Sequence, residues 1–321
     1  MKKPVWSWVE LTERDIPEIL KLISDIEDAD HSTIRTTRAE VESYFLDSHS
    51  WRAQGACVNG KLVAFGLVRT PLIADGEGTV TISGGVAKQW RAKGLGKDLM
   101  ERQVEVAQSV ANSVGLSPAR AVLYIEGAQP ELADLTHNLG FTPQSKFVTM
   151  RRNLDEDIAI DELSAYIDIV EMTAELSEDV RHIHNAVLSD NGQWQSQTPQ
   201  SWQERIKGFT AEWCLVAIDR FGDRPRVAGY VLSSAFSSTG EDDDEGYIEE
   251  IVVLPKWRGK SVAPALLRAA IERFDRGGMR YAGLDVNIPY PHHSERSLVD
   301  VFTAYGFDQI AETLIVERPL N

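Results

Sequence analysis

Apolar residues along the chain follow two spacings, one typical of helices and one typical of strands. Ile16, Ile19 and Ile23 repeat every three or four residues, which predicts a helix that buries one face. Residues 56–58 and 62–68 form continuous apolar runs around an Asn-Gly pair, which predicts a β-hairpin. Further strands are expected over residues 6–11, 80–86, 121–125, 166–172, 247–254 and 281–286, and helices over residues 97–111 and 263–274. This mixture predicts an α/β fold of the α+β type.

The same order of features occurs twice, which indicates a duplicated domain. Arg91 and Arg258 lie 167 residues apart, and Gly140 and Gly306, each followed by Phe, lie 166 residues apart. Because the separation stays close to one value and the order is kept, chance is a poor explanation. We expect an N-terminal domain over residues 1–152, a linker over residues 153–165 and a C-terminal domain over residues 166–321.

Composition narrows the class of protein. A chain of 321 residues suits two domains, and its 43% apolar and 26% charged content is that of a soluble globular protein. The formal net charge of −16 argues against binding to nucleic acid or an anionic membrane and favours a cationic substrate. Two cysteines are too few for a disulfide framework or a metal site, which favours a reducing cytoplasm. Neither a signal peptide nor a transmembrane helix is expected.

A basic turn with two glycines stands between a strand and a helix in the first half. It reads Arg-Ala-Lys-Gly-Leu-Gly-Lys over residues 91–97. The first N–H groups of a helix lack intrahelical partners, and glycine lets a ligand approach the backbone, so this turn suits a pyrophosphate. The second copy, over residues 258–263, has Ser261 in place of Gly94. Because serine adopts a positive φ at a cost, we expect weaker cofactor binding there.

Acidic residues precede the turn only in the second half. The strand before the second turn contains Glu249 and Glu250, whereas residues 79–86 contain no acid. Adjacent strand residues point to opposite faces, so one of the two acids is expected to face a cleft. Glu249 is favoured because it shares a face with Tyr247, and a β-bulge would move the choice to Glu250. The acidic run over residues 241–245 is expected to be a solvated hairpin loop.

These features together resemble the GNAT superfamily of N-acetyltransferases, in a tandem arrangement. The resemblance is carried by a strand ending in Val, the Arg-x-x-Gly-x-Gly turn and the Gly-Phe pair before a last strand, and it covers nearly all of both halves. The layout is similar to that of mycothiol synthases, which acetylate a sugar amine. The resemblance implies two tandem domains, each a mixed, V-splayed β-sheet flanked by helices. It also implies acetyl-CoA as co-substrate and no metal.

The resemblance further implies a cofactor site in each half and a general base in the second. The base would be Glu249 or Glu250. Tyr305 or water would protonate the leaving thiolate, because Thr136 and Phe302 stand where many members have a tyrosine. The expected cofactor-binding residues are Val86, Arg91, Ala92, Lys93, Gly94, Leu95, Gly96 and Lys97 in the first half, and Val252, Val253, Arg258, Gly259, Lys260, Ser261, Val262, Ala263 and Asn287 in the second.

The expected activity is transfer of an acetyl group from acetyl-CoA to the primary amine of a small molecule, with the C-terminal half catalytic and the N-terminal half a CoA binder without a base. One alternative is a decayed protein that binds acyl-CoA without catalysis. Acetylation of a sugar amine is a second alternative. In a third, the N-terminal half is catalytic and uses a base from elsewhere, such as Glu126. The oligomeric state is left open, although a tandem repeat could act as an internal dimer and so remain a monomer.

Overall fold

The computed structural model describes residues 5–320 except residues 31, 33–34, 46–48, 72–77, 156–165, 189–195, 222, 238–243 and 291–297. Most of the expected linker and most of the acidic run therefore lie outside the described residues. The chain forms two compact units. One contains residues 1–146, 289–291 and 313–321, and the other contains residues 147–288 and 292–312.

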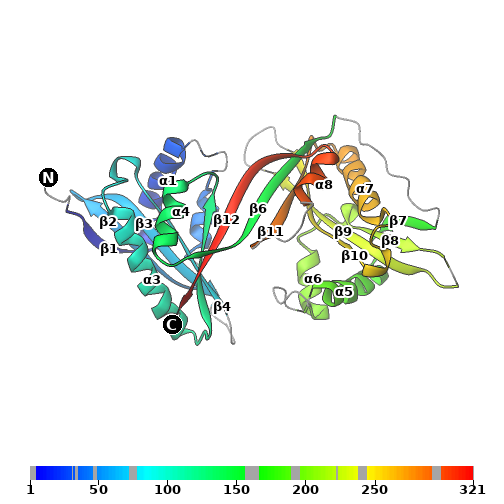
Figure 1. Cartoon of the computed structure of the whole chain (residues 1–321), viewed down its shortest axis with the longest axis horizontal. Helices are drawn as coiled ribbons and strands as arrows, with labels where there is room; N and C mark the ends of the chain where they lie inside the picture. The colour runs from blue at the N-terminus through cyan, green and yellow to red at the C-terminus, as the bar shows by residue number, and fades with distance from the viewer. Residues whose placement is uncertain are drawn as a thin grey trace. The chain divides into compact units, whose positions relative to one another are not determined.

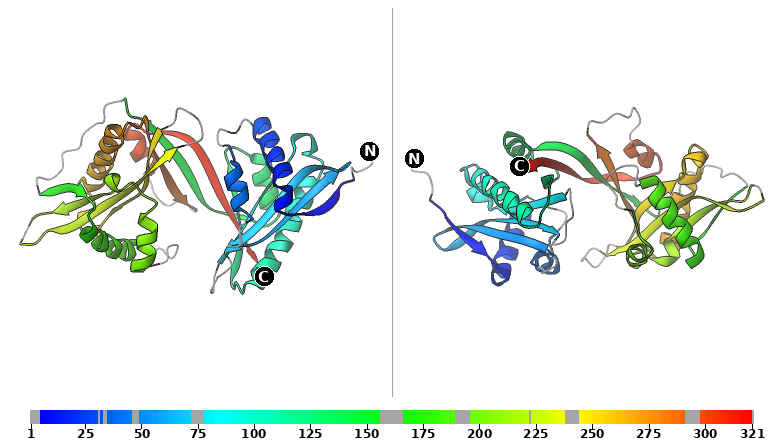
Figure 2. Two further views of the ribbon diagram at one scale, coloured as in Figure 1. Left: turned by 180° about the vertical axis from the view of Figure 1, so that it is seen from behind. Right: turned by 90° about the horizontal axis from the view of Figure 1, so that it is seen from below.

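The N-terminal unit is a sheet with helices on both faces (Figures 1 and 2). Its strands pair in the order β1-β2-β3-β4-β5-β12, and β4 and β5 run parallel. The elements are β1 (Ser7–Leu11), α1 (Ile16–Asp30), α2 (Arg38–Ser43), β2 (His49–Val58), β3 (Lys61–Pro71), β4 (Gly78–Val86), α3 (Leu95–Ser113), β5 (Ala119–Glu126) and α4 (Pro130–Asn138). The helix and hairpin expected from residues 16–68 are confirmed as α1, β2 and β3.

The C-terminal unit repeats this plan. Its strands follow the order β6-β11-β10-β9-β8-β7, and β10 and β11 run parallel. The elements are β6 (Thr142–Asn153), β7 (Ile167–Glu171), α5 (Ala174–Leu188), α6 (Pro199–Ile206), β8 (Leu215–Asp219), β9 (Arg226–Ser237), β10 (Asp244–Val253), α7 (Val262–Arg276), β11 (Tyr281–Pro289) and α8 (Leu298–Ala304). The first residues of β12 (Asp308–Leu320), 308–312, also belong to this unit, and the rest of β12 belongs to the N-terminal unit. No helix in the described part of the chain has the length and hydropathy needed to cross a membrane.

The expected division at residues 153–165 would give each unit one continuous segment of the chain. In the structure, each unit contains segments from both halves of the chain. Residues 313–320 of β12, at the end of the chain (red in Figure 1), pair antiparallel with β5. Val316 of this strand is 3% exposed and packs in the same core as Val80 and Phe141. In turn, residues 147–153 of β6 belong to the C-terminal unit. The last strand of each repeat is thus built into the unit formed by the other repeat.

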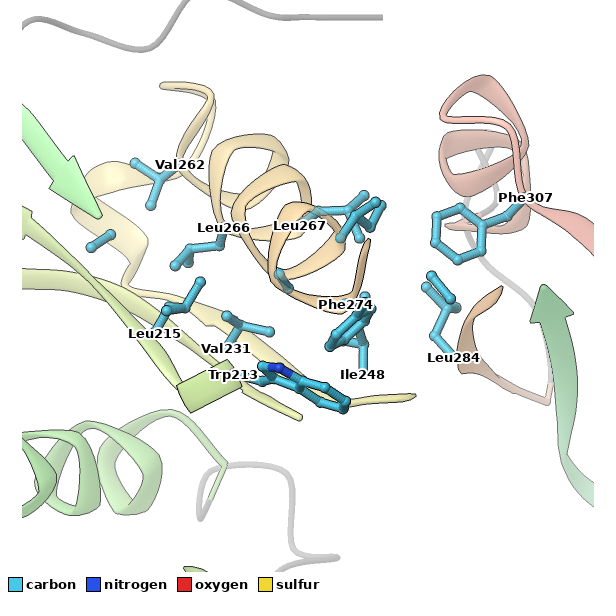
Figure 3. Close-up of a cluster of buried hydrophobic side chains, with 14 of the residues drawn as sticks. Trp213, Leu215, Val231, Ile248, Val262, Leu266, Leu267, Phe274, Leu284 and Phe307 are labelled. Carbon is cyan, nitrogen blue, oxygen red and sulfur yellow. The ribbon is translucent and has the colours of Figure 1, made fainter. Parts of the chain in front are cut away.

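Two cores cover the two faces of the C-terminal sheet. On one face, α7 packs Leu266 and Phe274 against Val231 and Ile248 (Figure 3). On the other face, α5 and α6 pack against Tyr230, Leu232 and Val252; the buried residues there include Val180 and Trp202. Side chains of β9 therefore alternate between the α7 face and the α5–α6 face, as the period of a strand requires.

The parallel strands of each unit part at equivalent places. In the N-terminal unit the last pair of β4 and β5 is Ile82 and Leu123, although both strands continue. In the C-terminal unit the last pair of β10 and β11 is Ile248 and Leu284. Beyond these pairs the backbone N–H and C=O groups on the facing edges of the two strands no longer pair with each other. The V-splayed sheet expected from the resemblance is therefore present in each unit.

Truncation of Val316 should destabilise the N-terminal unit, although this residue stands at the end of the chain. Loss of two buried methyl groups in V316A is expected to cost roughly 1–3 kcal/mol. Hydrogen exchange measured by mass spectrometry should then become faster in β5. The control I310A changes a residue of the same strand that is 48% exposed, and should leave β5 unchanged. Equal exchange in V316A and the wild type would contradict the strand assignment.

Candidate functional site

The basic turns of the two units have the same backbone conformation. In the first, Ala92 and Gly94 adopt φ of +56° and +91°, and in the second Gly259 and Ser261 adopt φ of +71° and +57°. Each turn thus has one glycine and one other residue in the left-handed region. Ser261 is strained, but Ala92 is strained to a similar degree. The expectation that Ser261 weakens only the second turn therefore loses its basis.

Each turn leads into a helix, and its arginine donates a hydrogen bond to the backbone carbonyl at the end of the preceding strand. Nε of Arg91 donates to the carbonyl of Val86 at 3.0 Å, and Nε of Arg258 donates to the carbonyl of Val253 at 3.3 Å. α3 begins directly after Gly94, and α7 begins directly after Ser261. The first N–H groups of each helix consequently point out of the turn, where an anion can accept from them.

The two arginines differ in what else they bind. Nη1 and Nη2 of Arg91 donate to the carboxylate of Asp30 at 2.6 and 2.7 Å, which raises the pKa of Arg91 and occupies its fork of donors. Arg258 makes no ion pair with any described residue and is exposed. A phosphate approaching the first turn must compete with Asp30, whereas one approaching the second turn meets an available guanidinium. The guanidinium of Arg258 is therefore the more accessible of the two, whereas the ranking of the turns as cofactor sites stays a prediction.

A β-bulge places both candidate bases on one face of the C-terminal sheet. Between β10 and β9, Ile248 pairs with Ser233 and Glu250 pairs with Leu232, so Glu249 is an extra residue without a partner. A bulge residue breaks the alternation of a strand. The expectation that the two acids point to opposite faces is therefore wrong. Because Ile248 and Ile82 both form the last pair before the strands part, Glu249 has no counterpart in β4.

Contacts to β9 confirm the common face. Glu249 accepts from Oγ of Ser234 at 2.6 Å, and Glu250 accepts from the hydroxyl of Tyr230. Tyr230 and Ser234 are four residues apart on β9 and so share a face, which is the one covered by α5 and α6. The bulge thus produces two neighbouring carboxylates beside these helices.

Glu250 is buried in a network of donors. Its side chain is 9% exposed; Oε1 lies 2.9 Å from Nδ1 of His184 and Oε2 accepts from Nη2 of Arg205 at 3.0 Å. Burial works to raise the pKa of Glu250, but hydrogen bonds from His184 and Tyr230 outweigh it and hold that pKa below its usual range. Burial, together with the charge of Glu250, raises the pKa of Tyr230. Glu250 is therefore ionised and fully engaged, which makes it a poor proton acceptor.

Glu249 has the opposite character, because it is exposed and its hydrogen bond to Ser234 leaves room for other partners. On the same face, Tyr247 of β10 donates to Asp285 of β11, and burial followed by the charge of Asp285 raises the pKa of Tyr247. Asp285 stands directly after the last pair of β10 and β11. Glu249 and Asp285 therefore lie on the two diverging strands, next to the opening between them.

The matching part of the N-terminal unit has no such acid. β4 keeps a regular register with β3 from Thr81 to Val86, and glycines stand at positions 84 and 85. Gln103 of α3 is buried and donates from Nε2 to the carbonyl of Ser83 at 2.7 Å. The opening of this unit is therefore lined by backbone and hydroxyl groups of β4 without a carboxylate from that strand.

Three other expected residues differ in how they are placed. Val252 is buried against α5 and α6, which leaves its backbone as the part available to a cofactor. Asn287 is exposed on β11, three residues beyond the last pair with β10. Tyr305 is partly buried and packs against the core that contains α7, and its carbonyl accepts from Arg152. Its role as a general acid stays a prediction.

Sequence reasoning missed the partners of Glu250. No motif in the sequence marks His184 as a partner of Glu250, and no group of metal ligands occurs among the described residues. Arg205 and Tyr230 lie 45 and 20 residues from Glu250. No local pattern joins them; only packing of α5 and α6 on the sheet does so. Similarly, Glu245 of the acidic run is 4% exposed and ion-paired with Arg151 at 2.6 Å, so it is not solvated as expected.

The network gives a pH-dependent prediction. A carboxyl group whose pKa is lowered on folding stabilises the fold above its unfolded pKa, and this contribution is lost as the pH falls through the folded pKa. Removal of a hydrogen bond to Glu250 in Y230F should lower the free energy of unfolding by about 1.5–3 kcal/mol at pH 7. Denaturant titrations should show this deficit shrinking only as the pH falls below about 4.3, the ordinary pKa of glutamate. A deficit independent of pH would contradict the account, and Y124F, which changes an exposed tyrosine, is the control.

Comparison with known proteins identifies the fold. Residues 177–294 match the family model described as the acetyltransferase (GNAT) family. No curated protein matches the chain at a significant level. A GCN5-related N-acetyltransferase from Sphaerobacter thermophilus has a similar structure, with 18% identity, a TM-score of 0.76 and coverage of 98% of this chain and 96% of that chain.

Two other solved structures extend the likeness to both halves. A tandem GNAT protein from the clavulanic acid biosynthesis pathway has 15% identity, a TM-score of 0.66 and coverage of 99% of each chain. A GCN5-related glucosamine N-acetyltransferase region of a fungal multidomain β-N-acetylglucosaminidase has 12% identity, a TM-score of 0.71 and coverage of 98% of this chain and 38% of that chain. At such identities the likeness shows the fold alone. The chain is thus similar to the GNAT acetyltransferases: residues 177–294 match their family model, and the whole chain has the fold of solved GNAT proteins, a tandem one among them.

Proposed function

We propose that the C-terminal unit transfers an acetyl group from acetyl-CoA to the primary amine of a small molecule, with Glu249 as general base. The observation that carries this proposal is the bulge in β10, which adds an exposed carboxylate where β10 and β11 part. The opening lies directly before the turn at Arg258, so one unit offers both a place for the cofactor and a base beside it.

The cofactor would use groups that the sheet leaves available. Its pyrophosphate would accept hydrogen bonds from the first N–H groups of α7 and from Arg258, which has no ion pair with a described residue. Its pantetheine arm would lie along the unpaired edge of β10 around Val252 and Val253, as an added strand does. This arrangement would bring the thioester to the level of the bulge. No metal ligand takes part in the proposed reaction.

Glu249 would accept the proton of the substrate amine. An aliphatic amine is mostly protonated near neutral pH and attacks a thioester only after losing a proton, which a positioned carboxylate can accept directly or through water. Glu249 is exposed and can do this, whereas protonation of Glu250 would break its pair with Arg205. The oxyanion that forms needs a preorganised donor, and the N–H of the bulge residue, left out of the ladder, is suited to this role.

The charge of the face supports an amine acceptor. Glu249 and Asp285 flank the opening, and both favour a cationic group over an anionic one. The tandem arrangement and a sugar amine remain compatible with this, but nothing in the residues selects a sugar. A protein that only binds acyl-CoA is less favoured, because such a protein has no need of an extra carboxylate at the opening. The cytoplasmic setting stays a prediction from the sequence.

The substitution E249Q tests the proposal. Loss of the base should lower kcat by about 10²–10⁴-fold, because general-base catalysis contributes that much, and should leave the Kd for acetyl-CoA unchanged. Release of free CoA thiol, measured against a panel of primary amines, reports turnover. The matched control E272Q removes a half-buried carboxylate on α7 that pairs with Arg268 and Arg276.

Undiminished turnover in E249Q would exclude Glu249 as the base. Binding of acetyl-CoA without thiol release by the wild type, with every amine of the panel, would instead favour the protein that binds without catalysis.

A further inference from the structure

The N-terminal unit carries a cation where the C-terminal unit carries hydroxyl and acidic groups. Arg69 of β3 pairs with Thr81 of β4, one residue before the last pair of β4 and β5. In the C-terminal unit the equivalent pair is Ser234 and Tyr247, one residue before Ile248. Ser234 donates to the carboxylate of Glu249, whereas Arg69 takes up the corresponding position with a guanidinium. The two openings therefore have opposite charge at matching places.

Arg69 is half-buried and has no carboxylate partner among the described residues. Its guanidinium carbon lies 4.5 Å from the centre of the Tyr44 ring. Stacking on an aromatic ring fixes the plane of a guanidinium and leaves the N–H donors at its edge directed outward. A half-buried cation of this kind is suited to receive a planar anion through two parallel hydrogen bonds.

Neutral hydrogen-bonding side chains share the face of the sheet on which Arg69 lies. Thr81 faces Arg69 across the strand pair, and Ser83 follows on the same face of β4. Tyr124 of β5 stands just beyond the last pair with β4 and is 50% exposed. Its neighbours Leu123 and Ile125 pack in the core on the α3 side, so Tyr124 faces the same side as Thr81. Two hydroxyl groups and an exposed aromatic ring thus lie on the same face of the sheet as the cation.

Nearby acids restrict the charge of a ligand. Burial raises the pKa of Tyr44, and the charges of Glu40, Glu126 and Glu27 raise it further, while Arg69 lowers it. Three carboxylates close enough to act on Tyr44 would repel a multiply charged anion such as phosphate. A single carboxylate, which matches the fork of one arginine, suits the site better.

We propose that the N-terminal unit binds a small monocarboxylate through Arg69, with its carboxylate on the guanidinium and its body against Tyr44 and Tyr124. This goes beyond the acetyl transfer proposed for the C-terminal unit and does not depend on it. The N-terminal unit is then a binding module for an acid, and the C-terminal unit acts on an amine.

Titration of the full chain with benzoate, lactate and glycine tests this inference, with inorganic phosphate and benzamide as comparison probes. At least one monocarboxylate should bind, more tightly than phosphate, and benzoate should bind more tightly than uncharged benzamide. R69Q should weaken that binding by about tenfold or more, since a hydrogen-bonded charge pair is lost. R69K keeps the charge but not the fork, and should retain part of the affinity.

The matched control is R102Q. The guanidinium carbon of Arg102 lies 4.5 Å from the ring centre of Trp8, on the α3 side of the sheet. R102Q therefore removes the same kind of contact without touching the proposed site. R102Q should bind the monocarboxylate as the wild type does. The proposal is overturned if no monocarboxylate binds, if phosphate binds more tightly, or if R69Q and R102Q have the same affinity. Thiol release by R69Q reports separately on the C-terminal unit.

Discussion

The β-bulge of β10 is the constraint on which the arrangement of the site depends, because a regular strand would send Glu249 and Glu250 to opposite faces. One extra residue turns both toward α5 and α6. There Glu250 becomes a buried anchor for His184, Tyr230 and Arg205, while Glu249 stays exposed. The anchor joins both helices to the strand that borders the opening. A buried ion of this kind is held by its partners, and the neighbouring carboxylate is then available for chemistry.

The two units share their backbone conformation and differ in their side chains. Both turns place residues in the left-handed region at the same two positions, and both sheets part after equivalent pairs. The differences concern charge: Arg91 is engaged by Asp30 and Arg258 is not, and Arg69 stands where Ser234 stands in the other unit. Such changes alter what each opening can bind while the backbone stays the same.

The sequence was informative where the signal is local. The repeat, the basic turns, the hairpin and the splayed sheet follow from periodicity and from the family pattern, and the structure contains them. The sequence allowed a bulge at Glu249 and Glu250 but did not predict one, because a register shift depends on how β10 pairs with β9. The network around Glu250 was missed, since His184 lies 66 residues away along the chain. The place of β12 was missed for the same reason: its partner β5 is far away in sequence, and each repeat contains every strand and helix expected of a complete domain.

The central claim is that one unit, the C-terminal one, both binds the cofactor and performs the transfer. Steady-state kinetics of R258Q and R91Q as a pair tests it most directly. The account predicts that R258Q raises the KM for acetyl-CoA by roughly tenfold, as loss of a charged hydrogen bond implies. R91Q should change that KM little, because Arg91 is already engaged by Asp30. A raised KM in R91Q with an unchanged value in R258Q would assign the reaction to the N-terminal unit and contradict the claim.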